Sequence, residues 1–359
     1  MQNKLRGLAE SMYSLTMFTV ANMRKDYRDA PVVNSMIGAG IDVLRYNLSY
    51  GTPEETREKI AIAREVIAKS ARDVKILADL PGNKIRLGKL FNDTFKVTKG
   101  QEVVFKSGTE AVDGSYVPVN FPKIGRFVKT GDVVTSKDGE LAFMVAAVDE
   151  DGFCGTALTS YEMISGKGFN CGRAIDELDH MTEQTVVQMR AIAEAEPDMV
   201  AFSFVNDKEK LKRAKERLAQ FAHPAWKPVI VAKIESPLGV ENISSIVDEC
   251  DMIMVARGDL GLQCDFRMLG LYQKNITKAV GAKGKKVIVA TQILDSLLSN
   301  FIPSRADILD LTNIVMDGAD GIMFSATSSA NDPAMLIKTA REIISAVSDG
   351  NPSPIGTNS

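Results

Sequence analysis

The sequence predicts an α/β fold: a (β/α)8 TIM barrel that carries a small all-β lid domain inserted after the third barrel strand. Short runs of apolar and β-branched residues alternate with helical patterns along the chain, and there are eight such runs. The runs are continuously apolar, which is typical of parallel strands buried on both faces. Between the third and fourth runs the pattern changes to short strands separated by Asp-Gly turns, which predicts the insertion.

The strands and helices alternate in the order that a barrel requires. Thr52 is followed by Pro53 and two glutamates, so it predicts a helix N-cap, and Ser236, Ser304 and Asp332 open further helices in the same way. The last helix is expected to run to about Val347. About eight helices then alternate with eight strands, the count of a (β/α)8 barrel. The expected strands are Ser14–Val20, Val43–Ser49, Lys75–Leu80, Met199–Val205, Val229–Glu235, Met252–Val255, Lys286–Thr291 and Gly321–Ser325.

The stretch from residue 87 to 169 breaks the β/α rhythm. Strand-like segments begin at Phe95, Glu102, Asp132 and Leu141, and turns such as Asp113-Gly114 separate them. We therefore expect a barrel made of residues 1–86 and 170–350, a β-barrel-like lid of residues 87–169, and a flexible tail of residues 351–359. An insertion after a barrel strand stands at the C-terminal mouth of the barrel, where it can act as a lid.

Composition excludes several classes of protein. Lys plus Arg number 43 and Asp plus Glu number 46, with no basic stripe, so nucleic acid is not an expected partner. The four cysteines lack C-x-x-C spacing and the two histidines fit no ligand pattern, so zinc and thiol-redox sites are not expected. No apolar run is long enough to span a bilayer, and we do not expect the N-terminal residues to form a signal peptide. We expect a cytoplasmic protein with reduced thiols and no membrane partner.

Reacting groups in β/α barrels lie at the C-terminal ends of the strands and in the loops that follow. Glu235 and Asp259 follow neighbouring strands, and two converging carboxylates suit Mg²⁺ or Mn²⁺ with positions left open for substrate. Backbone N–H groups from Gly258 onwards could contact a carboxylate. A small phosphate or carboxylate anion would suit the cationic residues around this site, which are Arg45, Lys84, Arg86 and Lys233.

Each of these residues also has a purely structural interpretation. Lys233 and Glu235 could form an ordinary surface ion pair, although a charge at the end of an apolar strand is costly unless it is used. Asp259 could be a helix cap. Thr291 and Ser203 could be packing hydroxyls.

Several segments resemble the barrel motifs of the pyruvate kinase family. The most specific is Met252-Ile-Met-Val-Ala-Arg-Gly-Asp-Leu-Gly261, accompanied by Ala232-Lys-Ile-Glu235 and Val289-Ala-Thr-Gln-Ile-Leu294. A weaker match is Leu44-Arg-Tyr-Asn-Leu-Ser49, and the resemblance covers about Val32 to Val347. It implies a barrel with an inserted lid. On this resemblance we also expect the family's C-terminal regulatory domain to be absent, because the chain stops soon after the expected eighth helix.

The resemblance implies specific residue roles. Glu235 and Asp259 would hold Mg²⁺ or Mn²⁺, and Lys233 would stabilise first the phosphoryl group and then the enolate. Thr291, with Ser325 nearby, would lie where the enolate is protonated, and Arg45 and Arg86 would clamp phosphate. The remaining substrate-binding residues would be Lys84, Ser203, Gly258 and Asp259, and a monovalent-cation site would comprise Asn47, Ser49 and Asp79. Lys84 lies where family members have Glu with potassium dependence or Lys without it, so K⁺ is not expected to be required.

The departures from the family pattern cluster on the nucleotide side. Asp79-Leu80-Pro81-Gly82-Asn83 replaces Asp-Thr-Lys-Gly-Pro, and the stretch Ser325–Asn331 loses an acid and a lysine. We expect a phosphotransferase that passes the phosphoryl group of phosphoenolpyruvate to ADP or another acceptor and releases pyruvate. One alternative is a metal-dependent lyase, an aldolase or decarboxylase that acts through a pyruvate enolate without nucleotide. Another is a non-catalytic phosphoenolpyruvate-binding paralogue. Association into a homo-oligomer through the barrel is also expected.

Overall fold

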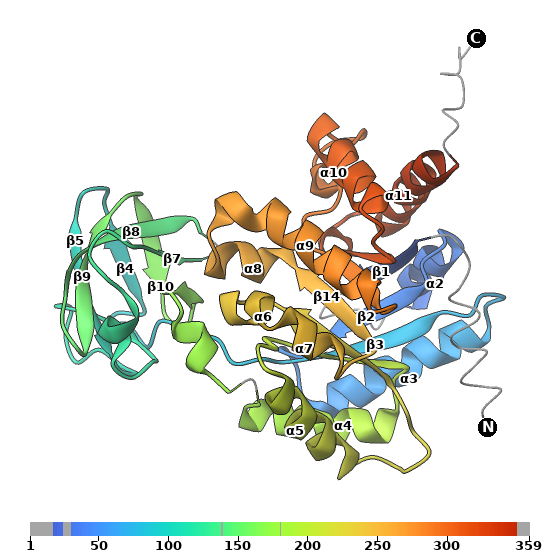
Figure 1. Cartoon of the computed structure of the whole chain (residues 1–359), viewed down its shortest axis with the longest axis horizontal. Helices are drawn as coiled ribbons and strands as arrows, with labels where there is room; N and C mark the ends of the chain where they lie inside the picture. The colour runs from blue at the N-terminus through green and yellow to red at the C-terminus, as the bar shows by residue number, and fades with distance from the viewer. Residues whose placement is uncertain (1–16, 24–29, 138, 180, 350–359) are drawn as a thin grey trace.

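The computed structural model describes residues 17–23, 30–137, 139–179 and 181–349 of the chain. Eight parallel strands close into a barrel (Figure 1), which confirms the predicted fold class. Around the barrel their order is β1 (Phe18–Asn22), β16 (Gly321–Phe324), β15 (Lys286–Ala290), β14 (Met252–Ala256), β13 (Val229–Ile234), β12 (Met199–Phe202), β3 (Lys75–Leu80) and β2 (Val43–Asn47).

Some strand ends differ from the sequence-based expectation. The first strand begins at Phe18 and continues to Asn22, later than predicted, and residues 14–16 of the expected strand lie outside the described residues. Strands β12 and β15 end earlier than expected, because Phe204 has φ 54° and Thr291 has φ 74°. A left-handed residue cannot continue a strand. The predicted tail, residues 351–359, also lies outside the described residues.

The helices begin at the predicted caps. The Thr52 side chain accepts a hydrogen bond from the Glu55 amide, and the Glu55 side chain accepts one from the Thr52 amide, both at 3.3 Å. Ser236, Ser304 and Asp332 likewise cap α6 (Pro237–Glu241), α10 (Arg305–Met316) and α11 (Pro333–Ser348). The other helices are α2 (Ala30–Gly38), α3 (Pro53–Ala68), α4 (Glu183–Ala195), α5 (Lys208–Ala219), α7 (Ile243–Val247), α8 (Arg257–Gln263) and α9 (Leu269–Ala282). Among the described residues, no helix combines the length and the apolar character needed to cross a membrane.

The barrel interior explains where the charged residues go. Val43, Leu77, Met199 and Val231 belong to one buried apolar cluster inside the barrel, on strands β2, β3, β12 and β13. Side chains two residues apart on a strand share a face. The same inward row therefore continues, towards the C-terminal mouth, with Arg45, Asp79, Ser203 and Lys233.

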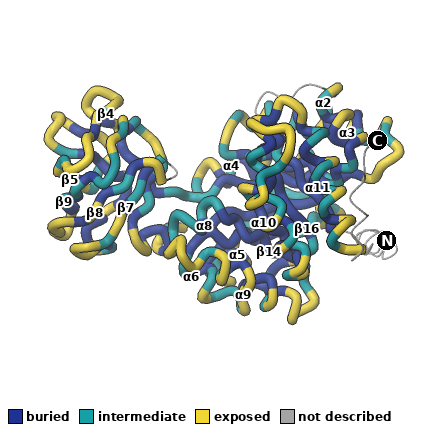
Figure 2. Tube along the Cα trace, turned by 90° about the horizontal axis from the view of Figure 1, so that it is seen from above, coloured by how far each residue is buried: buried dark blue, intermediate teal, exposed yellow. Residues whose placement is uncertain are grey.

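The inserted lid has its own buried core (Figure 2) and its own sheets. A six-stranded sheet has the order β11 (Phe169–Asn170), β7 (Val133–Ser136), β8 (Leu141–Val148), β9 (Gly152–Ala157), β5 (Glu102–Ser107) and β6 (Val117–Val119). A second sheet pairs β4 (Thr94–Val97) with β10 (Tyr161–Ile164). The Phe105 ring packs at 4.9 Å from that of Phe143 and at 4.8 Å from that of Phe153. This separate aromatic core lets the lid keep its shape independently of the barrel.

An aspartate immediately precedes every second barrel strand and bonds the neighbouring strand. Asp42 accepts a hydrogen bond from the Thr19 amide at 2.8 Å, and Asp198 accepts one from the Ile76 amide at 2.9 Å. Asp251 and Asp320 repeat the contact at 2.8 Å with the amides of Ile230 and Val287. These carboxylates satisfy amides at the N-terminal end of the barrel, where the strand ladder supplies no partner.

We expect the Asp198→Ala variant to lose about 1–3 kcal/mol of unfolding free energy, because the Ile76 amide is left without its acceptor. Urea denaturation followed by circular dichroism measures the change. Asp73→Ala is the matched control, since Asp73 is an exposed partner of Lys75 and its removal should cost under about 0.5 kcal/mol. Equal losses in the two variants would show that the repeated aspartates do not stabilise the barrel.

Candidate active site at the barrel mouth

A cavity of about 500 Å³ opens at the C-terminal end of the barrel strands. It is bordered by the ends of β2, β13, β14, β15 and β16 and by helix α8. Seven of the predicted site residues line it together: Arg45, Lys84, Lys233, Glu235, Gly258, Asp259 and Thr291.

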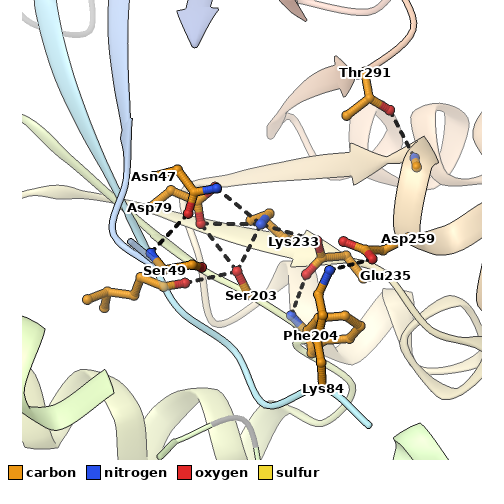
Figure 3. A network of polar contacts seen from close by, with 12 residues as sticks. Asn47, Ser49, Asp79, Lys84, Ser203, Phe204, Lys233, Glu235, Asp259 and Thr291 are labelled. Atoms are coloured by element: carbon orange, nitrogen blue, oxygen red, sulfur yellow. Dashed lines mark hydrogen bonds and ion pairs between the residues drawn. The ribbon is translucent and has the colours of Figure 1, made fainter. Parts of the chain in front are cut away.

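Four buried charged groups meet at the floor of this cavity: Arg45, Asp79, Lys233 and Glu235. Figure 3 shows the last three of them. The Lys233 Nζ lies 3.2 Å from the Asp79 carboxylate and 3.1 Å from Glu235 Oε1, and it donates to Ser203 Oγ at 2.8 Å. The Arg45 guanidinium donates to Asp79 Oδ2 through Nε at 2.8 Å and lies 2.6 Å from it through Nη2. Two cations therefore balance two carboxylates in a site largely closed to water. The surface ion pair that the sequence left open is excluded for Lys233, which is only 7% exposed.

The pKa values follow from burial and from these partners. Burial by itself would lower the pKa of Lys233, but Asp79 and Glu235 outweigh it and raise that pKa. Burial would raise the pKa of Asp79, but Lys233 and Arg45 outweigh it and lower that pKa. Burial raises the pKa of Glu235, Lys233 opposes this, and Asp259 adds to the rise. Glu235 is therefore the group whose ionised form most needs a further cation.

A second ion pair stands above this network. The Lys84 Nζ lies 2.6 Å from Asp259 Oδ1 and 5.3 Å from the centre of the Phe204 ring. Glu235 Oε2 accepts a hydrogen bond from the Phe204 amide at 2.7 Å, so the left-handed turn at Phe204 fixes the orientation of this carboxylate. Lys84 thus holds a positive charge at the carboxylate pair.

The two carboxylates fit a divalent metal in kind. Glu235 and Asp259 offer hard oxygen donors into one cavity, and no described group of three or more acidic, histidine or cysteine side chains offers an alternative cluster. Mg²⁺ commonly binds through one or two carboxylates and completes its coordination with waters and substrate phosphate. The donor set therefore suits Mg²⁺ or Mn²⁺ better than zinc, which prefers nitrogen and sulfur ligands.

Other predicted residues lie beside the cavity or away from it. Ser203 and Asp79 lie beneath it as partners of Lys233, and Ser325 Oγ accepts a hydrogen bond from the Gln292 amide at 3.2 Å. Asn47 Oδ1 accepts a bond from the Ser49 amide at 3.0 Å, at the end of β2. Their proposed roles stay predictions.

Arg86 stands apart from the cavity. Its side chain is exposed and donates to the Gly166 carbonyl at 3.0 Å, and its amide donates to Asn120 Oδ1 at 2.6 Å. Both partners belong to the lid, so the described arrangement holds Arg86 at the lid's base. Its role as a phosphate clamp also stays a prediction.

Sequence reasoning missed two residues that shape this site. Asn22, at the end of β1, accepts a hydrogen bond from Arg45 through its side-chain oxygen. Arg257 lines the cavity and donates to the backbone carbonyls of Thr291 and Gln292. Arg257 could have been identified from sequence, because it is a charged residue directly after an apolar strand and two residues before Asp259.

The chain is similar to known proteins over most of its length. The sequence profile of the pyruvate kinase barrel domain matches residues 18–334. The chain is 32% identical over 306 residues to pyruvate kinase from Thermococcus litoralis, covering 85% of this chain and 64% of that one. It is 32% identical over 325 residues to the enzyme from Mycobacterium tuberculosis, covering 89% of this chain and 67% of that one. The chain thus spans about two thirds of the length of these relatives.

A solved structure shows the same fold. The crystal structure of a pyruvate kinase from Cryptosporidium parvum superposes with a TM-score of 0.84 at 24% identity. The match covers 95% of this chain and 73% of that one, so it includes both the barrel and the inserted lid.

Proposed function

The chain belongs to the pyruvate kinase family, and from this we propose that it is a Mg²⁺-dependent phosphotransferase. Its reaction would transfer the phosphoryl group of phosphoenolpyruvate to ADP or another acceptor and release pyruvate. The observation that carries the proposal is the buried Lys233, held between Asp79 and Glu235 in the same cavity as Asp259 and Arg45. Such a cluster is costly to maintain without a role in catalysis.

The residues present can perform the electrostatic part of this reaction. Phosphoryl transfer requires charge neutralisation and alignment more than covalent help. The Lys233 ammonium would neutralise the phosphoryl oxygens during transfer and then the enolate oxygen left behind, while Arg45 would orient the phosphate. Glu235 and Asp259 would hold Mg²⁺ or Mn²⁺, which supplies a divalent charge for the substrate's oxygens.

Thr291 would act at the carbon that becomes the methyl group of pyruvate. Its Oγ1 accepts a hydrogen bond from the Gly258 amide at 2.9 Å, so its own hydroxyl hydrogen points elsewhere. Since Thr291 lines the cavity, that hydrogen is available for proton transfer to the enolate.

The acceptor and the monovalent cation are tested together by a phosphorus NMR time course. The sample contains phosphoenolpyruvate, Mg²⁺ and ADP in buffer whose monovalent cation is tetramethylammonium. We expect ATP to grow as phosphoenolpyruvate falls, with a rate that added K⁺ changes less than about twofold, because Lys84 supplies a fixed positive charge beside Asp259.

Further measurements on the same protein distinguish the alternative functions. Absence of ATP together with Mg²⁺-dependent deuterium exchange at the methyl group of pyruvate would favour another acceptor or a lyase. Absence of both, with thermal stabilisation by phosphoenolpyruvate alone, would favour a binding paralogue. The lost acid and lysine in the stretch Ser325–Asn331 are the reason to test ADP binding directly, by calorimetry in Mg²⁺.

We further propose a cytoplasmic homo-oligomer. The cysteines Cys154, Cys171, Cys250 and Cys264 are all unpaired thiols, which suits a reducing compartment. Large apolar side chains are exposed around helices α8 to α10, and a second copy of the chain is a suitable partner for them. They include Phe266, Leu271, Phe301, Ile302, Leu309 and Met316.

A further inference from the structure

The turn that follows β15 has an unusual backbone conformation. Thr291 has φ 74° and Gln292 has φ 52°, both in the left-handed region. That region is unfavourable for a β-branched residue such as threonine. Such conformations persist only where the surrounding structure over-determines them, and they cluster at functional sites.

The main-chain polar groups of this turn all have partners. The Thr291 amide donates to the Met323 carbonyl at 3.1 Å, and the Gln292 amide donates to Ser325 Oγ at 3.2 Å. Both carbonyls accept from one side chain, Arg257. Its Nη2 donates to Thr291 O at 2.6 Å and to Gln292 O at 2.9 Å, and its Nε donates to Thr291 O at 3.2 Å.

The Arg257 guanidinium is itself fixed on its other edge. Its Nη1 donates to both oxygens of Asp310 on α10 at 2.8 Å and contacts Gln273 Oε1 on α9 at 3.4 Å. Arg257 is only 7% exposed. A planar guanidinium can reach a carboxylate and two carbonyls at once, whereas a lysine ammonium is a single point of charge.

We propose that Arg257 is a positioning residue that holds the Thr291–Gln292 turn in its left-handed conformation. This conformation places Thr291 Oγ1 at the edge of the cavity, where it accepts a hydrogen bond from the Gly258 amide at 2.9 Å. Without Arg257 two carbonyls lose their donors, and the backbone relaxes towards a common conformation that moves Thr291. The catalytic consequence of this inference rests on the proposed function, whereas the structural part does not.

The test compares Arg257→Met and Arg257→Lys with matched substitutions at Arg341. Arg341 is a suitable control because it also pairs with an aspartate, Asp42, and donates to backbone carbonyls, including that of Gly40 at 2.7 Å. It does so at the opposite end of the barrel, since Asp42 precedes β2. A general effect of removing an arginine from the barrel would appear in both pairs of variants.

The structural readout is hydrogen–deuterium exchange measured by mass spectrometry. We expect Arg257→Met to speed exchange at least about tenfold in the peptides containing the Gly258 and Gln292 amides. The Gly258 amide donates to Thr291 Oγ1, and the Gln292 amide belongs to the turn itself, so both bonds depend on the turn's conformation. Arg257→Lys should show the same pattern to a smaller degree. The Arg341 variants should leave both peptides unchanged. Wild-type exchange at Gly258 and Gln292 in the Arg257 variants would overturn the proposal.

The catalytic readout is the rate of Mg²⁺-dependent deuterium exchange at the methyl group of pyruvate. We expect Arg257→Met to lower kcat about a hundredfold while KM for pyruvate changes less than about threefold, because a misplaced Thr291 affects proton transfer more than binding. Equal loss of kcat in the Arg341→Met variant would overturn a specific positioning role.

The two readouts separate failure of this inference from failure of the proposed function. A wild-type protein with neither enolate exchange nor phosphoryl transfer would contradict the proposed function, and hydrogen exchange would still decide whether Arg257 holds the turn. Should Arg257→Met unfold, Arg257→Lys decides: faster exchange confined to the two peptides supports the proposal, and a uniform rise along the chain overturns it.

Discussion

Lys233→Met is expected to lower kcat/KM for phosphoenolpyruvate about a thousandfold, because the buried ammonium contacts both Asp79 and Glu235. The substitution also removes the partner of two buried carboxylates, a change that costs about 3–5 kcal/mol when the remaining charge has no compensation. Arg45 still compensates Asp79, so the loss of stability should fall mainly on Glu235.

The loss of unfolding free energy in Lys233→Met should become smaller as the pH falls. Burial already raises the pKa of Glu235, and Lys233 opposes that rise, so removing Lys233 raises the pKa further. A carboxyl with a raised folded-state pKa costs stability when it is ionised, and it regains that stability as the pH falls through the folded-state pKa. The stability difference between wild type and Lys233→Met is therefore expected to be smaller at pH 5.5 than at pH 8. Urea denaturation at both values measures it.

Lys59→Met is the matched control for this prediction. Lys59 is buried to the same degree as Lys233, at 8% exposure, but its Nζ lies 3.9 Å from its partner Glu55 on helix α3, away from the cavity. It should retain wild-type activity. Equal activity losses in the two variants, or an active Lys233→Met protein, would contradict the assigned role.

The position of Lys233 and Glu235 at the barrel mouth could be predicted because both lie at the end of an apolar strand. Strand alternation then explains why Asp79 and Lys233 face the barrel interior. Asp79 lies two residues after Leu77, and Lys233 lies two residues after Val231. Each side chain therefore faces the barrel interior like the apolar residue before it, which the spacing along the strand is enough to predict. The rule that barrel sites gather at the strand C-termini then brings these residues together without knowledge of the contacts.

The contacts of Arg86 and Arg257 were not predicted, because their partners are distant in sequence. Arg86 lies beyond the end of β3, and its partners Asn120 and Gly166 are 34 and 80 residues away in the chain. Arg257 depends on Asp310, 53 residues away, and on carbonyls exposed by a left-handed turn. No periodicity in a single sequence encodes such pairings, and a β-branched residue such as Thr291 gives no signal for positive φ.

Glu235→Gln is expected to raise the half-saturating concentration of Mg²⁺ at least about tenfold and to lower kcat about a hundredfold or more. The amide keeps an oxygen for the Phe204 N–H bond, but it brings neutral donors where the carboxylate faces Lys233 Nζ at 3.1 Å. One of the two carboxylates proposed for the metal is then lost. Activity titrated against Mg²⁺, and Mn²⁺ binding followed by electron paramagnetic resonance, measure the two effects.

Loss of folding does not account for this expected result. The raised pKa of Glu235 means that its ionised form costs stability at neutral pH, so the neutral glutamine removes a cost while it weakens the pair with Lys233. Glu249→Gln is the matched control, because Glu249 lies 3.1 Å from Lys215 Nζ, the same separation as in the Glu235–Lys233 pair, and does not line the cavity. An unchanged half-saturating Mg²⁺ concentration in Glu235→Gln would show that this carboxylate does not hold the metal. Equal shifts in both variants would attribute the effect to net charge.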